Sequence, residues 1–98
     1  MKAMVMPRNL VLRDVEKLED RVKAAKYAIH ATYSVRLFDG TTSHYTTTRA
    51  VWFPKALIWP GSAPGSLHVP AWLVEEKETQ LARSLGASYL EIRHYESD

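Results

Sequence analysis

The four histidines are the residues best suited to chemistry in this chain, because a neutral imidazole is a common ligand of zinc and other metals. No two of them have the short spacing of a zinc motif, and the sequence contains no cysteine to join them. A hairpin would bring the first two toward each other, but no carboxylate accompanies them as a further ligand. We therefore expect no metal, and interpret all four as surface or strand residues: His30, His44, His68 and His94.

Motifs for nucleophilic catalysis and phosphate binding are not found either. The sequence has no Gly-x-Ser-x-Gly elbow to expose a nucleophilic serine. Residues 60–66 have the small side chains of a phosphate-binding loop, but they lack its lysine and the helix that should follow directly. We interpret this segment as a flexible loop, and we expect a protein without enzymatic activity and without a cofactor.

The remaining chemistry is that of aromatic rings and cations, which bind other macromolecules. The stretch 49–73 contains all three tryptophans and four of the five prolines. Exposed Trp, Tyr and Arg side chains dominate the energetics of protein interfaces, and aromatic rings also stack on nucleotide bases. The candidate binding residues are Arg36, His44, Tyr45, Arg49, Trp52, Lys55 and Trp59.

The first element expected to position these side chains is a helix at about 11–25. Apolar residues recur there at alternating steps of four and three, which is the spacing that lines one face of a helix. Asn9 or Asp14 is expected to cap its start. The apolar stripe consists of Val11, Val15, Leu18, Val22, Ala25 and Ile29.

Residues 27–38 alternate between apolar and polar side chains, which predicts a strand with one buried and one solvated face. Asp39, Gly40 and Thr41 have the composition of a hairpin turn. A two-residue loop would set polar residues of the second strand against the apolar face of the first. We therefore expect a three-residue loop with Gly40 or Thr41 in the left-handed conformation. The core-facing pairs are then Val35 with Tyr45, Ile29 with Val51, and Tyr27 with Phe53. The polar face pairs Arg36 with His44, Ser34 with Thr46, Thr32 with Thr48, and Ala28 with Trp52.

Proline and glycine mark the later elements. Pro54 cannot donate a ladder hydrogen bond, so the second hairpin strand is expected to end there. Short strands are expected at 56–59 and 67–69. A helix is predicted from Pro70 to about Leu85, where Gly86 ends it. Its inner face consists of Val74, Leu81 and Leu85, with Trp72 or Leu73 as the anchor of its start.

Residues 89–95 alternate Leu90 and Ile92 with charged residues, which predicts a last strand. The element order α-β-β-β-β-α-β predicts an α+β fold with a small, largely antiparallel sheet packed against two helices. A chain of 98 residues forms a single domain, and its ends at about 1–8 and 96–98 are expected to fray. No apolar run approaches the roughly 20 residues that cross a bilayer, so we expect a cytoplasmic protein without a membrane partner.

Two short motifs resemble a group of small phage and prophage proteins of unknown function. The segment 51–55, Val-Trp-Phe-Pro-Lys, is similar to their Trp-Leu/Phe-Pro-Lys-Ser strand motif. The segment 69–73, Val-Pro-Ala-Trp-Leu, is similar to their Val-Pro-x-Trp-Leu helix start. The resemblance covers about 49–78 and departs at Ala56 and Leu57, where serine and glutamine are usual. It implies a mobile-element origin and a small mixed fold, but it implies no reaction.

Two functions are compatible with these observations. The first is a non-enzymatic phage protein-binding module with a host or phage protein as partner, such as an inhibitor of a host defence complex of the CRISPR type. The alternative is a nucleic-acid-binding accessory module, in which Arg36, Arg49 and Lys55 neutralise phosphates while Trp52, Trp59 or Tyr45 stack on bases. The net charge of +2 is modest, which favours the first. A homodimer through an edge strand at 56–59 or through the helix at 11–25 is also expected.

Overall fold

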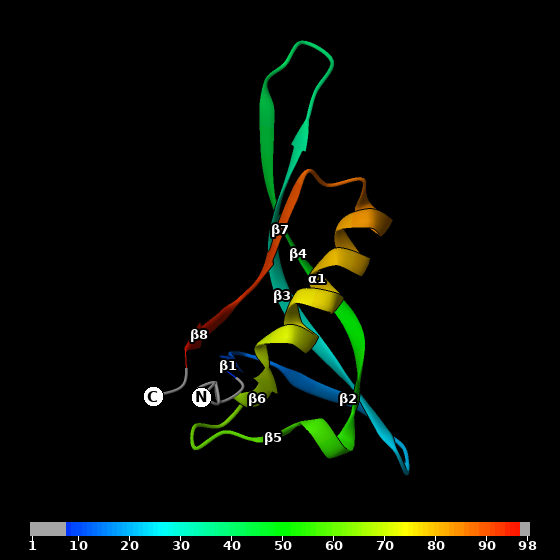
Figure 1. The fold of residues 1–98 in the computed structure, drawn as a ribbon, viewed down its shortest axis with the longest axis vertical. Coiled ribbons are helices and arrows are strands. Elements are labelled where there is room, and N and C mark those ends of the chain that lie inside the picture. Colours follow the sequence, from blue (N-terminus) through cyan, green and yellow to red (C-terminus); the bar gives the residue numbers. More distant parts are fainter. Residues whose placement is uncertain (1–7, 97–98) are drawn as a thin grey trace, which may run out of the picture.

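The computed structural model describes residues 8–96 as two four-stranded antiparallel sheets and one α-helix (Figure 1). Sheet A has the strand order β5-β6-β1-β8. Sheet B has the order β2-β3-β4, and β7 also pairs with β3. The elements are β1 Asn9–Leu12, β2 Glu16–Asp20, β3 Ala24–Arg36, β4 Thr42–Pro54, the 3₁₀ turn η1 Lys55–Leu57, β5 Trp59–Pro60, β6 Leu67–Pro70, α1 Ala71–Leu85, β7 Tyr89–Ile92 and β8 His94–Glu96.

The predicted α+β class with mostly antiparallel strands is confirmed, but the predicted helix at 11–25 is wrong. That segment forms β1, β2 and the start of β3. Residues 10–12 are consecutive apolar side chains, each at most 3% exposed, as in a strand that is covered on both faces. Asp14 has a left-handed φ of 56°, and Val22 is 92% exposed in the turn between β2 and β3. The apolar stripe therefore does not form one buried face. The described residues contain one α-helix instead of the predicted two, and two sheets instead of the predicted one, because β1 pairs with β6 and β8 rather than forming a helix.

The hairpin of β3 and β4 closes through a three-residue loop, as predicted, but the loop lies one residue earlier. Leu37 N donates to Thr41 O at 2.8 Å, and Gly40 N donates to Leu37 O at 3.0 Å. Gly40 has the left-handed φ of 86° that such a loop requires. The loop therefore consists of residues 38–40.

This earlier loop shifts every cross-strand pair by two residues, so the predicted pairs are wrong. Because a shift of two preserves the alternation of side chains, the predicted faces are nevertheless kept. Val35 and Tyr45 share the core-facing side, and Trp52 lies on the other. The observed pairs include Tyr33 with Tyr45, Val35 with Ser43, Ile29 with Arg49, Tyr27 with Val51, Ser34 with His44, Thr32 with Thr46, Lys26 with Trp52, and Arg36 with Thr42.

The segment after β4 differs from the predicted strand at 56–59. β4 ends at Pro54 as expected, but η1 follows, and β5 contains only Trp59 and Pro60. The loop 60–66 is closed by its own hydrogen bonds, because Gly61 N donates to Ser66 O at 3.0 Å and Ser66 N to Ala63 O at 3.2 Å. The strand predicted at 67–69 is confirmed as β6.

Helix α1 has the predicted boundaries. Pro70 precedes its first turn, and Gly86 caps its end with a left-handed φ of 65°. Leu73 anchors its start, because this side chain is 3% exposed whereas Trp72 is 50% exposed. Leu81 and Leu85 pack against the core from the same face of the helix, as predicted.

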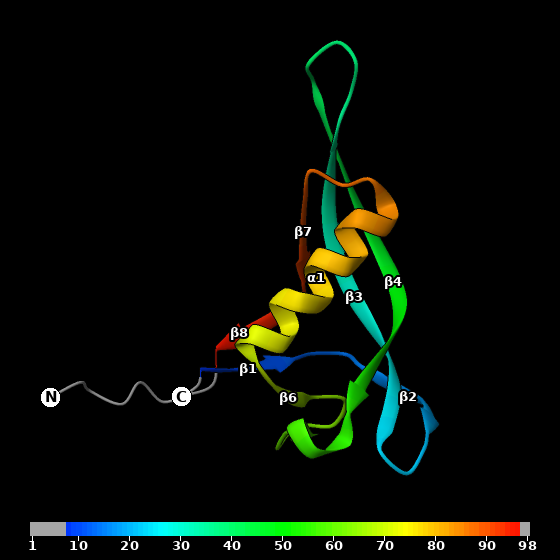
Figure 2. The same cartoon turned by 45° about the vertical axis from the view of Figure 1, so that its right-hand side comes forward.

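The last predicted strand is divided between the two sheets (Figure 2). β7 pairs with β3 and buries Leu90 and Ile92. At Arg93, whose N–H donates to His30 O at 2.8 Å, the chain leaves sheet B. It then joins sheet A as β8, beside β1. Helix α1 packs against β7, β6 and β1, so one apolar core connects both sheets.

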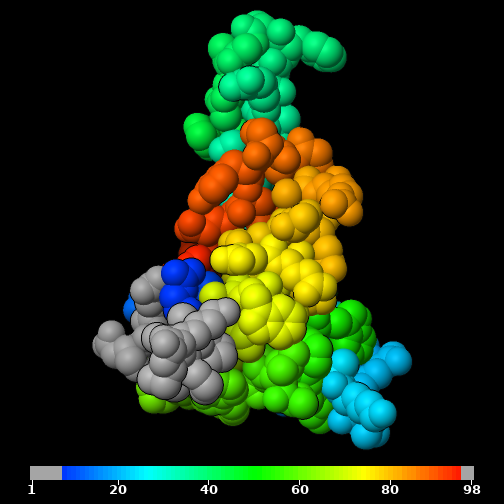
Figure 3. Space-filling view, viewed as in Figure 1, coloured from blue at the N-terminus to red at the C-terminus, as the bar shows by residue number. Residues whose placement is uncertain are grey.

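The predicted frayed ends lie mostly outside the described residues. Of the residues described there, Arg8 accepts a hydrogen bond from Ala71 N at 2.8 Å, and Glu96 pairs with Leu10. Over residues 8–96, no helix combines the length and the apolar character needed to cross a lipid bilayer. The hairpin end around 36–42 projects away from the rest of the protein (Figure 3).

Candidate binding face of sheet B

Sheet B has one face covered by the core and one face without a helix, which we call the open face. Cross-strand partners share a face, and the buried side chains of β3 and β4, such as Ile29 and Phe53, have odd numbers. The open face therefore comprises the even-numbered residues of β3 and β4. Tyr89 and Glu91 of β7 belong to it as well, because they lie opposite Ser34 and Thr32.

Two shallow hollows lie next to each other on this face. The larger has a volume of about 450 Å³, and its lining includes Ser34, His44 and Tyr89. The second has about 310 Å³, and its lining includes His30, Thr48 and Arg93. Both are also lined by Thr32 and Thr46, so they form a continuous trough across β3 and β4 that is lined by aromatic rings at one end and by polar side chains at the other. Its shallow, open form suits the surface of a macromolecule better than an enclosed small molecule.

Two hydroxyl–imidazole pairs cross the trough with similar geometry. Ser34 Oγ lies 2.9 Å from His44 Nδ1, and Thr48 Oγ1 lies 3.1 Å from His30 Nδ1. Within residues 8–96, no carboxylate forms a hydrogen bond or ion pair with either imidazole. The pair at Ser34 therefore lacks the third group that orients the base in a catalytic triad. Its repetition at Thr48 is consistent with cross-strand side-chain pairing of a β-ribbon.

The four histidines are not gathered into one site. His30 and His44 lie four residues apart along the hairpin, opposite Thr48 and Ser34. His68 stacks on Trp59 in sheet A, with ring centroids 5.2 Å apart. Among the described residues, no group of three or more His, Asp or Glu side chains is arranged to hold a metal ion.

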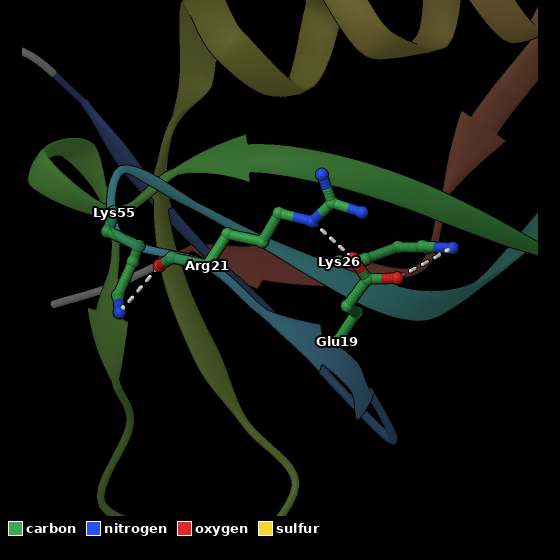
Figure 4. Close-up of polar contacts among 4 residues, drawn as sticks. All are labelled: Glu19, Arg21, Lys26 and Lys55. Carbon is green, nitrogen blue, oxygen red and sulfur yellow. Dashed lines mark hydrogen bonds and ion pairs between the residues drawn. The ribbon is translucent and has the colours of Figure 1, made fainter.

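Trp52 lies on the open face and is partly exposed, as the sequence predicts. The Arg21 guanidinium and the Lys26 ammonium each lie 5.2 Å from its ring centroid, within the range of cation–π contact. Glu19 binds both cations, with Lys26 Nζ at 3.6 Å and the Arg21 guanidinium in hydrogen-bond contact (Figure 4). The Arg21 hydrogen bond is the main cause that lowers the pKa of Glu19. This end of the open face is thus an indole bordered by two cations that share one carboxylate.

Two predicted residues lie on the core-facing side of the hairpin instead. Tyr45 stacks on Tyr33 with ring centroids 5.2 Å apart, and its side chain is 46% exposed. Arg49 is exposed on the same side, opposite Ile29. Both project from the part of β4 that the core leaves uncovered, and therefore away from Trp52.

Lys55 has a structural role. Its Nζ lies 2.9 Å from Asp20 Oδ1 and donates to Arg21 O at 3.0 Å, which ties the end of β4 to the turn after β2. The hydrogen bond from Lys55 is the main cause that lowers the pKa of Asp20. Trp59 lies on sheet A, where it stacks on His68 and remains 44% exposed.

Of the seven predicted binding residues, the structure brings three to the open face: Arg36, His44 and Trp52. The sequence reasoning missed Arg21, Tyr89 and Glu91, which reach this face from β7 and the β2–β3 turn. Tyr89 is 57% exposed and donates a hydrogen bond to Glu91 Oε2 at 2.9 Å. Only the pairing of β7 with β3 places it there, and no local sequence signal predicts that pairing.

These features define a small α+β protein with an uncovered polar and aromatic sheet face. Comparison with protein-family models, with curated proteins and with solved structures finds no match to this chain.

Proposed function

We propose that this chain is a cytoplasmic, non-enzymatic protein-binding module that acts through the open face of sheet B. Trp52 and Tyr89 supply the large, rigid rings that anchor protein interfaces. The hydroxyls and imidazoles between them supply hydrogen-bonding groups along the trough. The resemblance of 49–78 to small phage proteins favours a host or phage protein as the partner, and inhibition of a host defence complex of the CRISPR type is the corresponding role.

The arrangement of the cations is the observation that supports a protein partner over nucleic acid. The alternative function needs Arg36, Arg49 and Lys55 on one surface, because each must neutralise a phosphate of the same strand. Arg36 lies at the far end of the open face, Arg49 lies on the opposite face, and Lys55 is engaged with Asp20. These three cations do not form a track for a phosphate backbone.

The other cations of the open face are paired with carboxylates. Arg21 and Lys26 share Glu19, and Arg93 pairs with Asp14 at 3.3 Å. Glu91 lies on the same face, so the carboxylates Glu19, Asp14 and Glu91 offset these three cations. Such a surface has little net positive field to attract a polyanion. It retains the mixture of rings, paired charges and polar groups that is common in interfaces between folded proteins.

Capture from a host lysate, followed by a binding assay with the purified partner, tests the proposal. Tyr89→Ala removes an exposed ring from the open face, and we expect it to weaken binding at least about tenfold, as for an interface hot spot. Trp72→Ala is the matched control, since Trp72 is 50% exposed on α1 and lies off the open face. A partner that tolerates Tyr89→Ala but not Trp72→Ala would refute this choice of surface.

A labelled single-stranded oligonucleotide serves as the probe for the alternative function. Salt-dependent binding that Arg49→Glu abolishes would favour nucleic acid and contradict the proposal. We expect no binding at low salt.

A further inference from the structure

The outer edge of β4 is the longest unpaired strand edge among the described residues. β4 spans 13 residues, and all of its described pairing is with β3. On β3 the other edge is occupied in part by β2 and in part by β7. Figure 2 shows β4 on the side of the sheet away from β7. An unpaired edge is a template for a further strand.

The hydrogen bonds at the two ends of the hairpin identify which backbone groups point outward. Leu37 N donates to Thr41 O, and Lys55 N donates to Lys23 O, so the odd-numbered pairs are the hydrogen-bonded ones. The even-numbered residues of β3 point outward, and two of their carbonyls accept bonds from Ser88 N and Arg93 N. By the same alternation, the outward N–H and C=O groups of β4 belong to Thr42, His44, Thr46, Thr48, Ala50 and Trp52.

The other strand edges of sheet B have features that prevent pairing with a further strand, whereas the outer edge of β4 has almost none. At β7, the outward Ile92 N–H donates to Glu78 Oε2 of α1 at 2.8 Å. β2 carries four charged residues and a register shift after Lys17. β4 pairs with β3 without any register shift, and its proline is the last residue, Pro54. Arg49 is its only Lys, Arg, Asp or Glu. Natural sheets use charges, prolines and bulges to prevent edge pairing, so this edge is suited to it.

We propose that a second copy of this chain pairs with β4 in antiparallel orientation, about a two-fold axis at Thr47. The six outward residues are symmetric about that position. Thr42 then lies opposite Trp52 of the second copy, His44 opposite Ala50, and Thr46 opposite Thr48, so every outward group is paired. Arg49 lies opposite Tyr45 of the second copy, which avoids two facing arginines and permits a cation–π contact.

The same pairing supports the projecting end of the hairpin. Beyond β7, residues 35–43 form a two-stranded ribbon, which is at best marginally stable by itself in water. It carries Phe38, which is fully exposed, and Leu37, which is 42% exposed. Antiparallel pairing gives each ribbon a third strand from the well-packed half of the second β4, which is the half that contains the buried Val51 and Phe53. If the register continues past Thr42, it also brings the loop 38–40, which contains Phe38, near η1 of the second copy.

There is room for the added strand. A groove of about 250 Å³ separates the well-packed half of β4 from α1, and its lining includes Val51, Lys77 and Leu81. The helix therefore leaves the edge uncovered at the position where the second copy must enter.

The two-fold axis is perpendicular to the sheet, so both open faces lie on the same side of the dimer. The dimer thus uses a different surface from the proposed protein-binding site.

A single introduced cysteine tests the register, because the chain contains no other. In the proposed dimer, residue 47 faces its own copy as a non-hydrogen-bonded pair with Cα atoms about 4.5 Å apart. That distance lies within the range of a disulfide, roughly 4.4–6.8 Å. We expect Thr47→Cys to form a covalent dimer under mild oxidation. Arg49→Cys is the matched control on the same strand and face, because its two copies are about 13 Å apart along the sheet.

Sedimentation and light scattering of the unmodified chain test the dimer itself, with an expected mass of twice the monomer. Thr46→Pro removes one outward N–H without removing a bond to β3 and should yield a monomer, whereas Thr46→Val should remain a dimer. Circular dichroism checks that the proline variant is folded. An unmodified chain that is monomeric at all concentrations would overturn the proposal, leaving the edge to a strand of another protein. Equal cross-linking at residues 47 and 49 would also overturn it.

Discussion

Replacing Glu78 by alanine should destabilise the fold by about 1–3 kcal/mol, although Glu78 is a charged residue of a solvent-facing helix. Its Oε2 atom accepts the backbone N–H of Ile92 at 2.8 Å. The Ile92 side chain is fully buried, so water has limited access to its amide. Alanine would leave that donor unsatisfied, and the expected loss is the desolvation penalty of one buried N–H group.

Glutamine at the same position separates the hydrogen bond from the charge. Burial is the main cause that raises the pKa of Glu78. The folded state therefore favours the protonated carboxyl relative to the unfolded state. Glu78→Gln keeps an oxygen acceptor without the charge, and its stability at pH 7 should equal or exceed that of the unmodified chain.

The raised pKa of Glu78 determines how the stability of the fold changes with pH. The contribution of the protonated carboxyl to stability is fully present below its unfolded pKa, and it is lost as the pH rises through the raised folded pKa. Relative to Glu78→Gln, the unmodified chain should gain stability between pH 7 and pH 4. Urea unfolding of both proteins and of Glu78→Ala at the two pH values measures this. Equal destabilisation by glutamine and alanine would refute the acceptor role.

Three further predictions concern the packing and the loops. Phe53→Ala should cost about 3–5 kcal/mol in urea unfolding, because this ring is fully buried and contacts Tyr27 edge-on at 6.2 Å. Gly61→Ala should lower the melting temperature, because a Cβ there would overlap the Ser66 side chain, and the additional change Ser66→Gly should restore part of the loss. Lys55→Met should lower the stability in urea unfolding only slightly, and raising the salt concentration should reduce that difference, because about half of each side chain of its ion pair with Asp20 is exposed to solvent.

The faces of the hairpin were predictable from sequence, but its register was not. Alternation of apolar and polar residues fixes which side chains share a face, and two registers that differ by two residues satisfy it equally well. The choice depends on where the loop begins. Asp39 accepts bonds from Thr41 N at 3.0 Å and Thr41 Oγ1 at 2.6 Å, and Gly40 occupies the left-handed position. A loop of residues 38–40 permits both the Asp39–Thr41 hydrogen bonds and the left-handed Gly40. The aromatic side chain of Phe38, however, does not indicate a loop position.

The N-terminal segment was mispredicted because its apolar spacing fits two structures. Steps of three and four occur by chance when short strands of four or five residues alternate with turns. The buried residues of β1 and the exposed Val22 belong to different environments, and only the long-range partners of β1 reveal this. Helix α1 was predicted well because proline and glycine define its ends locally.

The candidate site was predictable in the part that depends on local sequence patterns. Trp52 follows from the alternation of β4, so its position on the polar face could be expected. Lys55 and Trp59 could not be assigned, because η1 redirects the chain between them. The residues of the open face that come from β7 depend on pairing between distant segments, which single-sequence patterns do not encode.

The position of β1 between β6 and β8 has a consequence for the order in which the chain folds during translation. Leu10 pairs with Val69 on one side and with Glu96 on the other, so sheet A needs segments that lie more than about 50 residues from β1 in the sequence. The neighbouring strands β2, β3 and β4 pair with one another in sequence order and can assemble as soon as they emerge. A nascent chain should therefore form the β2-β3-β4 part of sheet B first, and it should add β7 to sheet B and complete sheet A only after β7 and β8 have emerged, because distant partners are the slowest to meet.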